Sequence, residues 1–252
     1  MDLHDYLKRL NYHGSLEPTL LNLRALHEAH LLAVPFENLN IHLGRKILLD
    51  EEALWAKIVE QRRGGFCYEL NGSFAWLLRT LGFQVELLSA GVANETGGFG
   101  PEFDHLALLV HLEGEDWLAD VGFGELFRQP LQMQASLVQS QEWGKYRLER
   151  EENDWIMQVW GADKWEPAYR FTLQAHELHD FDGMCEYHQT SPKSHFTQRR
   201  ICSIATPVGR TTLSELLLIT KIHGERKERL FANQEEYASA LAEYFGVVLP
   251  FV

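Results

Sequence analysis

The sequence predicts an α+β fold in which helices come first, an antiparallel sheet or barrel follows, and short strands with one helix end the chain. Three observations support this prediction. The apolar residues have a helical period up to about residue 85, they alternate like strands afterwards, and a capped apolar stripe lies near the end. With 252 residues the chain is long enough to bury a sizeable core in one, two or three domains.

Residues 1–85 predict four helices with short links, which is typical of a small bundle. Asp50 is the expected N-cap of the third helix. The fourth begins after Gly64 and Gly65 and ends at Gly82, because glycine favours the end of a helix. The apolar faces of the four helices are Leu3, Tyr6, Leu7 and Leu10; Leu16, Leu20, Leu23 and Leu26; Leu54, Ile58 and Val59; and Leu70, Phe74, Leu77, Leu78 and Leu81.

From Gln84 the pattern becomes strand-like, and the strands follow one another as hairpins. One hairpin turns at residues 113–115 and a second at 152–154. Hairpins in succession favour an antiparallel sheet or barrel. By contrast, the stretch 176–196 is polar and irregular, and no regular element is expected there. The expected strands are 85–92, 103–112, 116–121, 143–150, 155–160 and 168–173.

The last fifty residues contain short strand candidates and one helix with a clear start. Asn233 is the expected N-cap, and Glu236 falls at the third helical position, as a capping box requires. The apolar face of this helix is Tyr237, Leu241, Tyr244 and Phe245. The strand candidates are 201–206, 216–223 and 225–230.

Acidic residues outnumber basic ones by 36 to 23, which gives a formal net charge of −13. A general binder of nucleic acid or anionic membranes would have a basic face, so neither partner is expected. The amino terminus lacks the pattern of a signal peptide, and no apolar run approaches the roughly 18 residues of a membrane span. Three cysteines at irregular spacing argue against a disulfide framework. We therefore expect a cytoplasmic protein with reduced thiols.

A cysteine stands where the glycine pair meets the fourth helix, in the stretch Arg62-Arg63-Gly64-Gly65-Phe66-Cys67. The unpaired N–H groups and the dipole at a helix N-terminus favour an anion, so the pKa of the Cys67 thiol is expected to be lowered. A nucleophilic cysteine also needs a base, and the base needs a group that orients it. The alternative is that Cys67 is simply a small buried apolar residue.

The candidate base is His105, at the mouth of an apolar strand, and the candidate acid is Asp120, at the end of the next strand. An antiparallel hairpin brings the start of its first strand near the end of its second, so these side chains are expected to meet. A turn centred between Leu112 and Glu113 would set them directly opposite, and the turn residues indicate a slightly later centre. Rival acids are Asp104 and Asp116, and rival bases are His111 and His195.

Five short motifs follow one another along the chain. They are Val34-Pro35-Phe36-Glu37-Asn38-Leu39, Arg62-Arg63-Gly64-Gly65-Phe66-Cys67, Asp104-His105-Leu106, Asp120-Val121-Gly122-Phe123-Gly124 and Ser191-Pro192-Lys193-Ser194-His195-Phe196. Each is a weak signal alone, but together and in this order they resemble the arylamine N-acetyltransferase family. The resemblance covers residues 1–200 well and the last fifty only loosely.

The resemblance implies a three-part α+β fold. An N-terminal helical bundle over 1–85 would carry the cysteine, a central antiparallel β-barrel over 86–196 the histidine and aspartate, and a C-terminal α/β lid would span 197–252. This division agrees with the changes of period along the chain. The loop after Gly124 lacks an insertion found in some vertebrate members, so the chain resembles the bacterial type.

The resemblance also implies a Cys67–His105–Asp120 triad and a ping-pong reaction with acetyl-CoA as co-substrate and no metal. Cys67 would take the acetyl group from the thioester and pass it to an arylamine or arylhydrazine. Glu37 and Arg63 match a structural ion pair near the nucleophile. These implications describe an enzyme of xenobiotic metabolism with small-molecule partners, as a monomer or homodimer.

Further site residues carry over from the family. Phe36 and Phe123 match positions that line the amine pocket, where a flat aromatic substrate would stack, although ordinary core residues are the alternative. Asn71, Asp104 and Gly124 are the expected contacts to CoA. Asp104 stands where a neutral residue is common in the family, so its carboxylate either raises the pKa of the adjacent base or faces solvent.

Other interpretations remain open at this point. Cys185 and His188 have a plausible spacing for zinc, but no second ligand pair accompanies them. His27 and His30 are expected to be buried and hydrogen-bonded rather than ligands. The same triad order serves cysteine hydrolases. An amide synthase with a larger acyl donor and a non-catalytic CoA-binding relative are the remaining alternatives.

Overall fold

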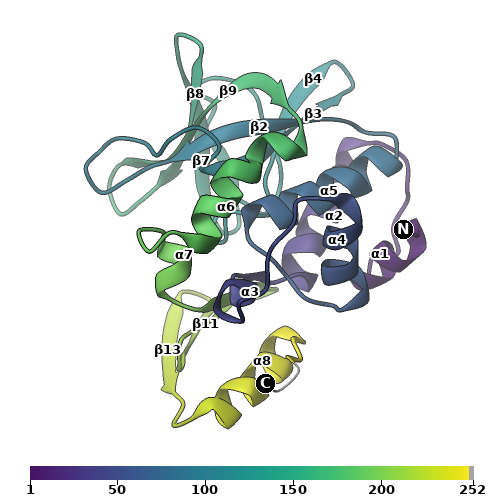
Figure 1. Cartoon of the computed structure of the whole chain (residues 1–252). Coiled ribbons are helices and arrows are strands. Elements are labelled where there is room, and N and C mark those ends of the chain that lie inside the picture. Colours follow the sequence, from purple (N-terminus) through teal and green to yellow (C-terminus); the bar gives the residue numbers. More distant parts are fainter. Residues whose placement is uncertain (250–252) are drawn as a thin grey trace.

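The computed structural model describes residues 1–249, in which a group of helices packs against a large antiparallel sheet and a smaller sheet with a last helix follows (Figure 1). The predicted α+β class is confirmed. The helical elements of the first third are α1 (Leu3–Arg9), α2 (Leu20–Ala33), α3 (Leu39–His42), α4 (Glu51–Trp55), a π-helical turn (Ala56–Glu60) and α5 (Cys67–Thr80). The two-residue strand β1 (Phe36–Glu37) lies between α2 and α3.

Capping residues decide where the helices begin. The predicted N-cap Asp50 is confirmed, since its side chain accepts a backbone hydrogen bond in the first turn of α4. The apolar face predicted for the second helix began at Leu16. This start is wrong, because α2 begins at Leu20 with Thr19 as its N-cap. Pro18 disfavours helical backbone in the residue before it, so the helix cannot extend toward Leu16.

Eight antiparallel strands form the large sheet, in the spatial order β5-β4-β3-β2-β9-β8-β7-β6. Each strand expected from the alternation of residues after Gln84 is present, with boundaries shifted by a few residues. The strands are β2 (Gln84–Val92), β3 (His105–Leu112), β4 (Glu115–Ala119), β5 (Leu131–Gln132), β6 (Gln139–Gln141), β7 (Gly144–Glu151), β8 (Asp154–Trp160) and β9 (Trp165–His176).

Glutamine side chains join the two edges of this sheet. The side-chain amide of Gln139 in β6 accepts from the backbone N–H of Gln132 in β5 at 2.8 Å and donates to its carbonyl at 3.0 Å. Gln141 bonds the backbone of Gln129 in the same way. Unpaired sheet edges attract other strands, and these amides satisfy the exposed backbone groups instead. The expected antiparallel sheet or barrel is therefore a near-barrel closed by side chains.

The β3–β4 hairpin fixes the register near the predicted base and acid. Its turn residues Glu113 and Gly114 have φ angles of 55° and 83°, which is the backbone of a tight two-residue hairpin turn. The turn is therefore centred between Glu113 and Gly114, slightly later than a centre between Leu112 and Glu113, as the turn residues indicated. Pairing ends at Leu108 and Ala119, so the chain leaves the sheet just before the predicted acid.

The stretch 176–196 is mostly helical, which corrects the expectation of an irregular segment. It contains a 3-10 turn (Leu178–Phe181), α6 (Asp182–Thr190) and α7 (His195–Gln198). Within α6 only Cys185 and His188 are buried. A face with two buried residues, one of them polar, is too short to form an apolar stripe that sequence analysis can recognise.

The smaller sheet combines both ends of the chain, because β1 pairs with β10 next to α2 and α3. Its other strands are β10 (Ile201–Thr206), β11 (Gly209–Ser214), β12 (Leu217–Ile222) and β13 (Glu225–Leu230). β11 was not expected because its sequence is polar; it is held between two neighbours. The last helix α8 (Gln234–Phe245) starts as predicted, with the Asn233 side chain accepting from two backbone N–H groups at 3.0 Å.

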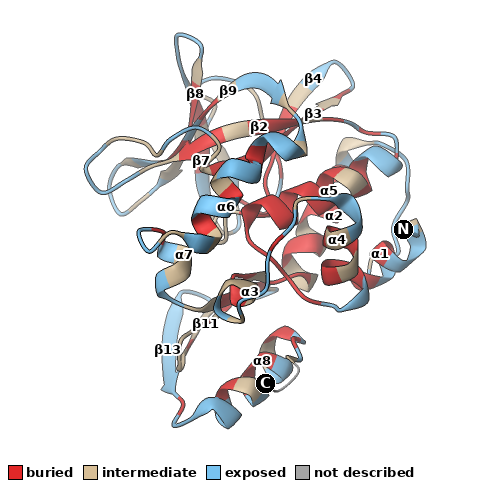
Figure 2. Ribbon diagram, in the orientation of Figure 1, coloured by how far each residue is buried: buried red, intermediate tan, exposed pale blue. Residues whose placement is uncertain are grey.

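Helix α5 is the most central helix of the molecule, and its inner residues belong to the main hydrophobic core (Figure 2). It packs against the other helices on one side and against β2 and β3 on the other. The first residue of α5 is Cys67, so the fold places this cysteine where the helices meet the sheet. Among residues 1–249, no helix has the length and apolarity that crossing a bilayer requires.

Candidate active site

Two glycines shape the elbow before α5. A Cβ on Gly64 would lie 1.8 Å from the carbonyl oxygen of Pro35, and a Cβ on Gly65 would lie 2.6 Å from the side chain of Glu69. Neither position has room for a side chain, because real Cβ atoms do not approach other heavy atoms so closely. The glycine pair thus allows the chain to pass close to its neighbours and to start α5 at Cys67, as predicted.

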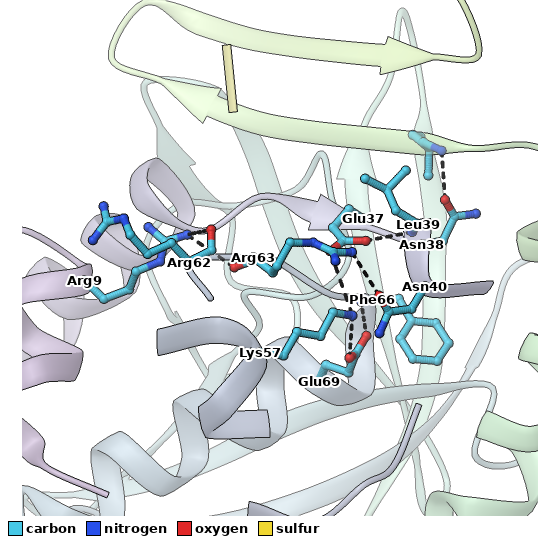
Figure 3. Close-up of polar contacts among 11 residues, drawn as sticks. Arg9, Glu37, Asn38, Leu39, Asn40, Lys57, Arg62, Arg63, Phe66 and Glu69 are labelled. Carbon is cyan, nitrogen blue, oxygen red and sulfur yellow. Dashed lines mark hydrogen bonds and ion pairs between the residues drawn. The ribbon is translucent and has the colours of Figure 1, made fainter. Parts of the chain in front are cut away.

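Four buried charged side chains support this elbow (Figure 3). The Arg63 guanidinium lies 2.7 Å from Glu37 Oε1, which confirms the predicted ion pair. Lys57 Nζ lies 2.7 Å from Glu69 Oε1, and the other oxygen of Glu69 accepts from the Phe66 N–H at 3.1 Å. Two positive and two negative groups balance in a space without water access, where any unpaired charge is strongly unfavourable.

His105 and Asp120 meet at the open end of the hairpin, which confirms the predicted contact. His105 Nε2 lies 2.8 Å from Asp120 Oδ2, and both residues are buried. Burial acts to raise the pKa of Asp120, but His105, Asn71 and the Gly122 N–H together hold it below its usual value. An ionised Asp120 can only accept, so Nε2–H donates to it and Nδ1 of His105 keeps the lone pair.

Asn71 joins helix α5 to the dyad of His105 and Asp120. Its Nδ2 donates to the Leu106 carbonyl at 2.6 Å and to Asp120 Oδ1 at 2.8 Å. Its Oδ1 accepts from the Val121 N–H at 2.9 Å, and the residue is 0% exposed. The family resemblance implied that Asn71 contacts CoA, and in the structure its amide bonds only other groups of the protein.

The backbone of Cys67 lies directly against the loop after β4. A Cβ on Gly122 would fall 2.8 Å from the Cα of Cys67. Burial raises the pKa of the thiol well above its ordinary value, and a hydrogen bond from the Leu106 N–H only partly offsets this. The lowered pKa expected from the helix N-terminus is therefore wrong, because desolvation outweighs the N–H groups. A proton leaving this thiol needs a base in the same buried space, and His105 directly precedes Leu106.

Aromatic rings surround the dyad. The Phe123 ring stands edge-on to His105 at 5.2 Å, and the Tyr169 ring lies 5.2 Å from His105 and 5.3 Å from Phe123. Burial and the charge of the nearby Asp120 raise the pKa of Tyr169 well above its ordinary value. Phe36 is half-buried and lies 6.2 Å from the ring of Phe196.

The remaining predicted contacts to CoA, Asp104 and Gly124, are half-buried. Asp104 is directed toward α6: its Oδ1 lies 3.1 Å from His188 Nε2, at an angle too poor for a hydrogen bond. The other nitrogen of His188 lies 3.1 Å from the Ser194 hydroxyl. The Asp104 side chain is only 18% exposed, which excludes the alternative that it simply faces solvent. The Gly124 carbonyl accepts a hydrogen bond from the Arg210 guanidinium.

The rival residues lie elsewhere. His111 pairs with Asp116 at 2.6 Å near the turn of the hairpin, away from the cysteine. His195 is exposed on α7. For the zinc alternative at Cys185 and His188, the part of the chain that the structure describes brings together no group of three or more potential metal ligands.

Two residues near the dyad make contacts that the sequence patterns did not predict. Tyr169 falls inside an expected strand, where the alternation of residues indicates that a side chain is buried but not which side chains it contacts. His27 was correctly expected to be buried and hydrogen-bonded, but its partner, the backbone N–H of Asp120 at 3.1 Å, comes from a distant part of the chain. No local sequence signal identifies such a pair.

The profile of a protein family described as N-acetyltransferase matches residues 19–252. Together with a cysteine at a helix start beside a buried His–Asp pair, this defines the chain as an acyltransferase of the N-acetyltransferase class. The arylamine N-acetyltransferase of Escherichia coli K12 is 35% identical over 98% of this chain and 86% of its own length. The arylamine N-acetyltransferase / N-hydroxyarylamine O-acetyltransferase of Salmonella typhimurium is 40% identical over 84% of this chain and 76% of its own length.

Solved structures agree with the sequence comparisons. The arylamine N-acetyltransferase from Salmonella typhimurium superposes with a TM-score of 0.93 at 35% identity, covering 99% of this chain and 92% of that one. The Mycobacterium marinum enzyme in complex with CoA gives a TM-score of 0.90 at 32% identity, covering 98% and 93%. The chain therefore belongs to the arylamine N-acetyltransferase family, which confirms the resemblance found in its motifs.

Proposed function

We propose that the chain moves an acetyl group from acetyl-CoA to an arylamine or arylhydrazine in two steps, through an acetyl group carried on Cys67. The observation that carries this proposal is the buried His105–Asp120 pair. The free nitrogen of this pair belongs to His105, the residue before Leu106, whose N–H favours the ionised form of the Cys67 thiol. Family membership supports the acceptor class. The Mycobacterium marinum relative in complex with CoA supports the donor.

In the first step Nδ1 of His105 accepts the thiol proton while Sγ of Cys67 forms a bond to the carbonyl carbon of the thioester. The tetrahedral intermediate collapses, the bond from this carbon to the CoA sulfur breaks, and His105 returns the proton to that sulfur. The products are acetyl-Cys67 and free CoA. Asp120 holds the ring of His105 in one tautomer and stabilises the imidazolium that forms between the two transfers.

In the second step the amine nitrogen forms a bond to the acetyl carbon, and His105 accepts one of the amine protons. The bond between the acetyl carbon and Sγ of Cys67 then breaks, which releases the amide. The proton on His105 passes to the thiolate and restores the starting state. Because the thiol is buried and its pKa raised, thiolate exists only while a proton sits on the adjacent base.

Backbone N–H groups can stabilise the oxyanion of each tetrahedral intermediate. The first N–H groups of α5 have no partner within the helix, so the N–H of Cys67 is one candidate donor. The Leu106 N–H is the second candidate, because it favours the ionised form of the Cys67 thiol. Both groups are fixed by secondary structure before the substrate arrives, as efficient electrostatic stabilisation requires.

The predicted substrate and CoA residues differ in the contacts that they already make within the protein. We propose that Phe123 and Phe36 stack on the aromatic acceptor, since both are half-buried and Phe123 stands edge-on to the base. Gly124 and Asp104 stay our candidates for CoA contacts. Asn71, with its amide fully engaged, is proposed to orient Asp120 instead of touching CoA.

We propose that each of three stretches has its own part in the site. Residues 1–85 supply the nucleophile, residues 86–196 supply the base and the acid, and residues 197–252 cover the site. One hydrophobic cluster lies entirely within 86–196 and another mostly after residue 200, whereas the largest joins the helices of the first stretch to the large sheet. The three cysteines are buried and free, which supports a reducing compartment, and we propose the cytoplasm.

A burst of CoA release tests the two-step route. Mixed with excess acetyl-CoA and no amine, the protein is expected to release one equivalent of CoA rapidly, because acetylation does not need the acceptor. Cys67→Ser is expected to release none, whereas Cys185→Ser, which alters another buried thiol of the same core, should keep the burst. A wild-type protein that releases CoA only when an amine is present would contradict the proposal and favour direct transfer.

A further inference from the structure

A histidine from helix α2 reaches across the core to the loop that follows β4. His27 is 0% exposed, and its ring lies parallel to Phe127 at 5.8 Å and edge-on to Phe74 at 5.9 Å. Its Nε2 lies 3.1 Å from the backbone N of Asp120, and its Nδ1 lies 2.8 Å from the carbonyl oxygen of Arg128. One ring thus bonds both ends of the stretch from Asp120 to Arg128.

The partners determine the tautomer of this ring. A backbone N–H can only donate, so Nε2 of His27 must carry a lone pair toward Asp120. A carbonyl oxygen can only accept, so Nδ1 must carry the hydrogen toward Arg128. Only the neutral Nδ1–H form satisfies both contacts. Burial lowers the pKa of His27 to about 4, which keeps this neutral form at physiological pH.

The loop needs such a partner because the sheet ends just before it. Pairing of β3 with β4 stops at Ala119, so the Asp120 N–H has no strand beside it. An unpaired buried N–H is costly, and a displaced Asp120 would lose its alignment with His105. The same loop carries Phe123 and Gly124, so the positions of these proposed substrate and CoA contacts also depend on how the loop is held.

We propose that His27 is a positioning residue. Its two hydrogen bonds fix both ends of the loop 120–128, and this holds Asp120 and Phe123 in place. This inference rests on the proposed function of Asp120. His27 touches no reacting atom and acts only through the backbone of the loop. Its removal should therefore lower the rate of the chemical step and leave the KM for the acetyl donor largely unchanged.

The test compares variants at two buried histidines on one helix. His27→Leu removes both hydrogen bonds, and His27→Gln keeps one donor and one acceptor in a similar position. His30→Leu is the matched control, because His30 is also 0% exposed but contacts Tyr6 at 3.3 Å instead of the loop. The readout is the rate of CoA release in a single turnover, corrected for the folded fraction of each variant.

His27→Leu is expected to slow acetylation of Cys67 about 10–100-fold, as when other residues that orient an active group from outside are removed. His27→Gln should restore most of this rate, and His30→Leu should match the wild type. Equal losses in His27→Leu and His30→Leu, or no loss in His27→Leu, would overturn the proposal.

A spectroscopic measurement separates this inference from the proposed function. Ring nitrogen NMR of the wild type, assigned by the signal that is missing in His27→Gln, is expected to report the neutral Nδ1–H tautomer of His27 at pH 7. The opposite tautomer or a protonated ring would overturn the proposed role of His27. If the wild type forms no acetyl-Cys67, the proposed function fails, and this ring signal still decides whether His27 holds the loop.

Discussion

Asp120→Asn is expected to lower the rate of Cys67 acetylation about 10⁴-fold while the protein stays folded. The carboxylate of Asp120 accepts from Nε2–H of His105, which leaves Nδ1 free to take the thiol proton. An asparagine can turn its NH₂ group toward the ring, so that the hydrogen of the imidazole moves to Nδ1 and the base nitrogen is blocked. The measurement is the single-turnover rate of CoA release with excess acetyl-CoA.

The same hairpin supplies the control for this prediction. Asp116 pairs with His111 at 2.6 Å, so Asp116→Asn makes the identical change to a histidine–aspartate pair at the other end of the two strands. This variant should release CoA at the wild-type rate. If the two variants lose activity equally, the effect belongs to the stability of the hairpin and the role of Asp120 is contradicted.

Glu37→Gln is expected to lower the free energy of unfolding by about 3–5 kcal/mol, since it leaves buried positive charge without its partner. Glu37 is 0% exposed and lies 2.7 Å from Arg63 and 3.9 Å from Lys57 (Figure 3). Its second oxygen also accepts from the Leu39 N–H at 2.7 Å. Urea denaturation followed by circular dichroism measures the loss as a shift of the midpoint at unchanged slope.

An ion pair at the protein surface provides the control for the Glu37→Gln prediction. Glu215 lies 3.0 Å from the Arg200 guanidinium, but its side chain is 46% exposed. Glu215→Gln should therefore cost only about 0–1 kcal/mol, because water and salt screen such pairs. A Glu37→Gln variant as stable as Glu215→Gln would mean that water reaches the elbow before α5, and the charge network would lose its proposed role.

Local signals in the sequence predicted the parts of the site that depend on neighbouring residues. The glycine pair and the apolar face of α5 located Cys67 at a helix start. The hairpin around residues 113–115 predicted that His105 and Asp120 meet at its open end, although it left the exact register open. Both predictions rest on periodicity and turn chemistry, which act within about ten residues of the chain.

Properties that depend on distant residues could not be predicted in this way. The pKa of Cys67 is raised because the helices and the sheet together exclude water, although the helix N-terminus alone would lower it. Asn71 was assigned to CoA from its match to a family position, and nothing in its local sequence shows that it also bonds Asp120 and Leu106. β11 (Gly209–Ser214) was missed because its polar residues become a strand only between two partners.

The central claim is that the acetyl group passes through Cys67, and the most direct measurement is the mass of the peptide that contains this residue. The protein is mixed briefly with acetyl-CoA without amine, quenched in acid and digested. We expect one added acetyl group on Cys67, absent from Cys185 and Cys202, that disappears when an arylamine is added before the quench. An unmodified Cys67 in a protein that still acetylates arylamines would contradict the proposed route through Cys67.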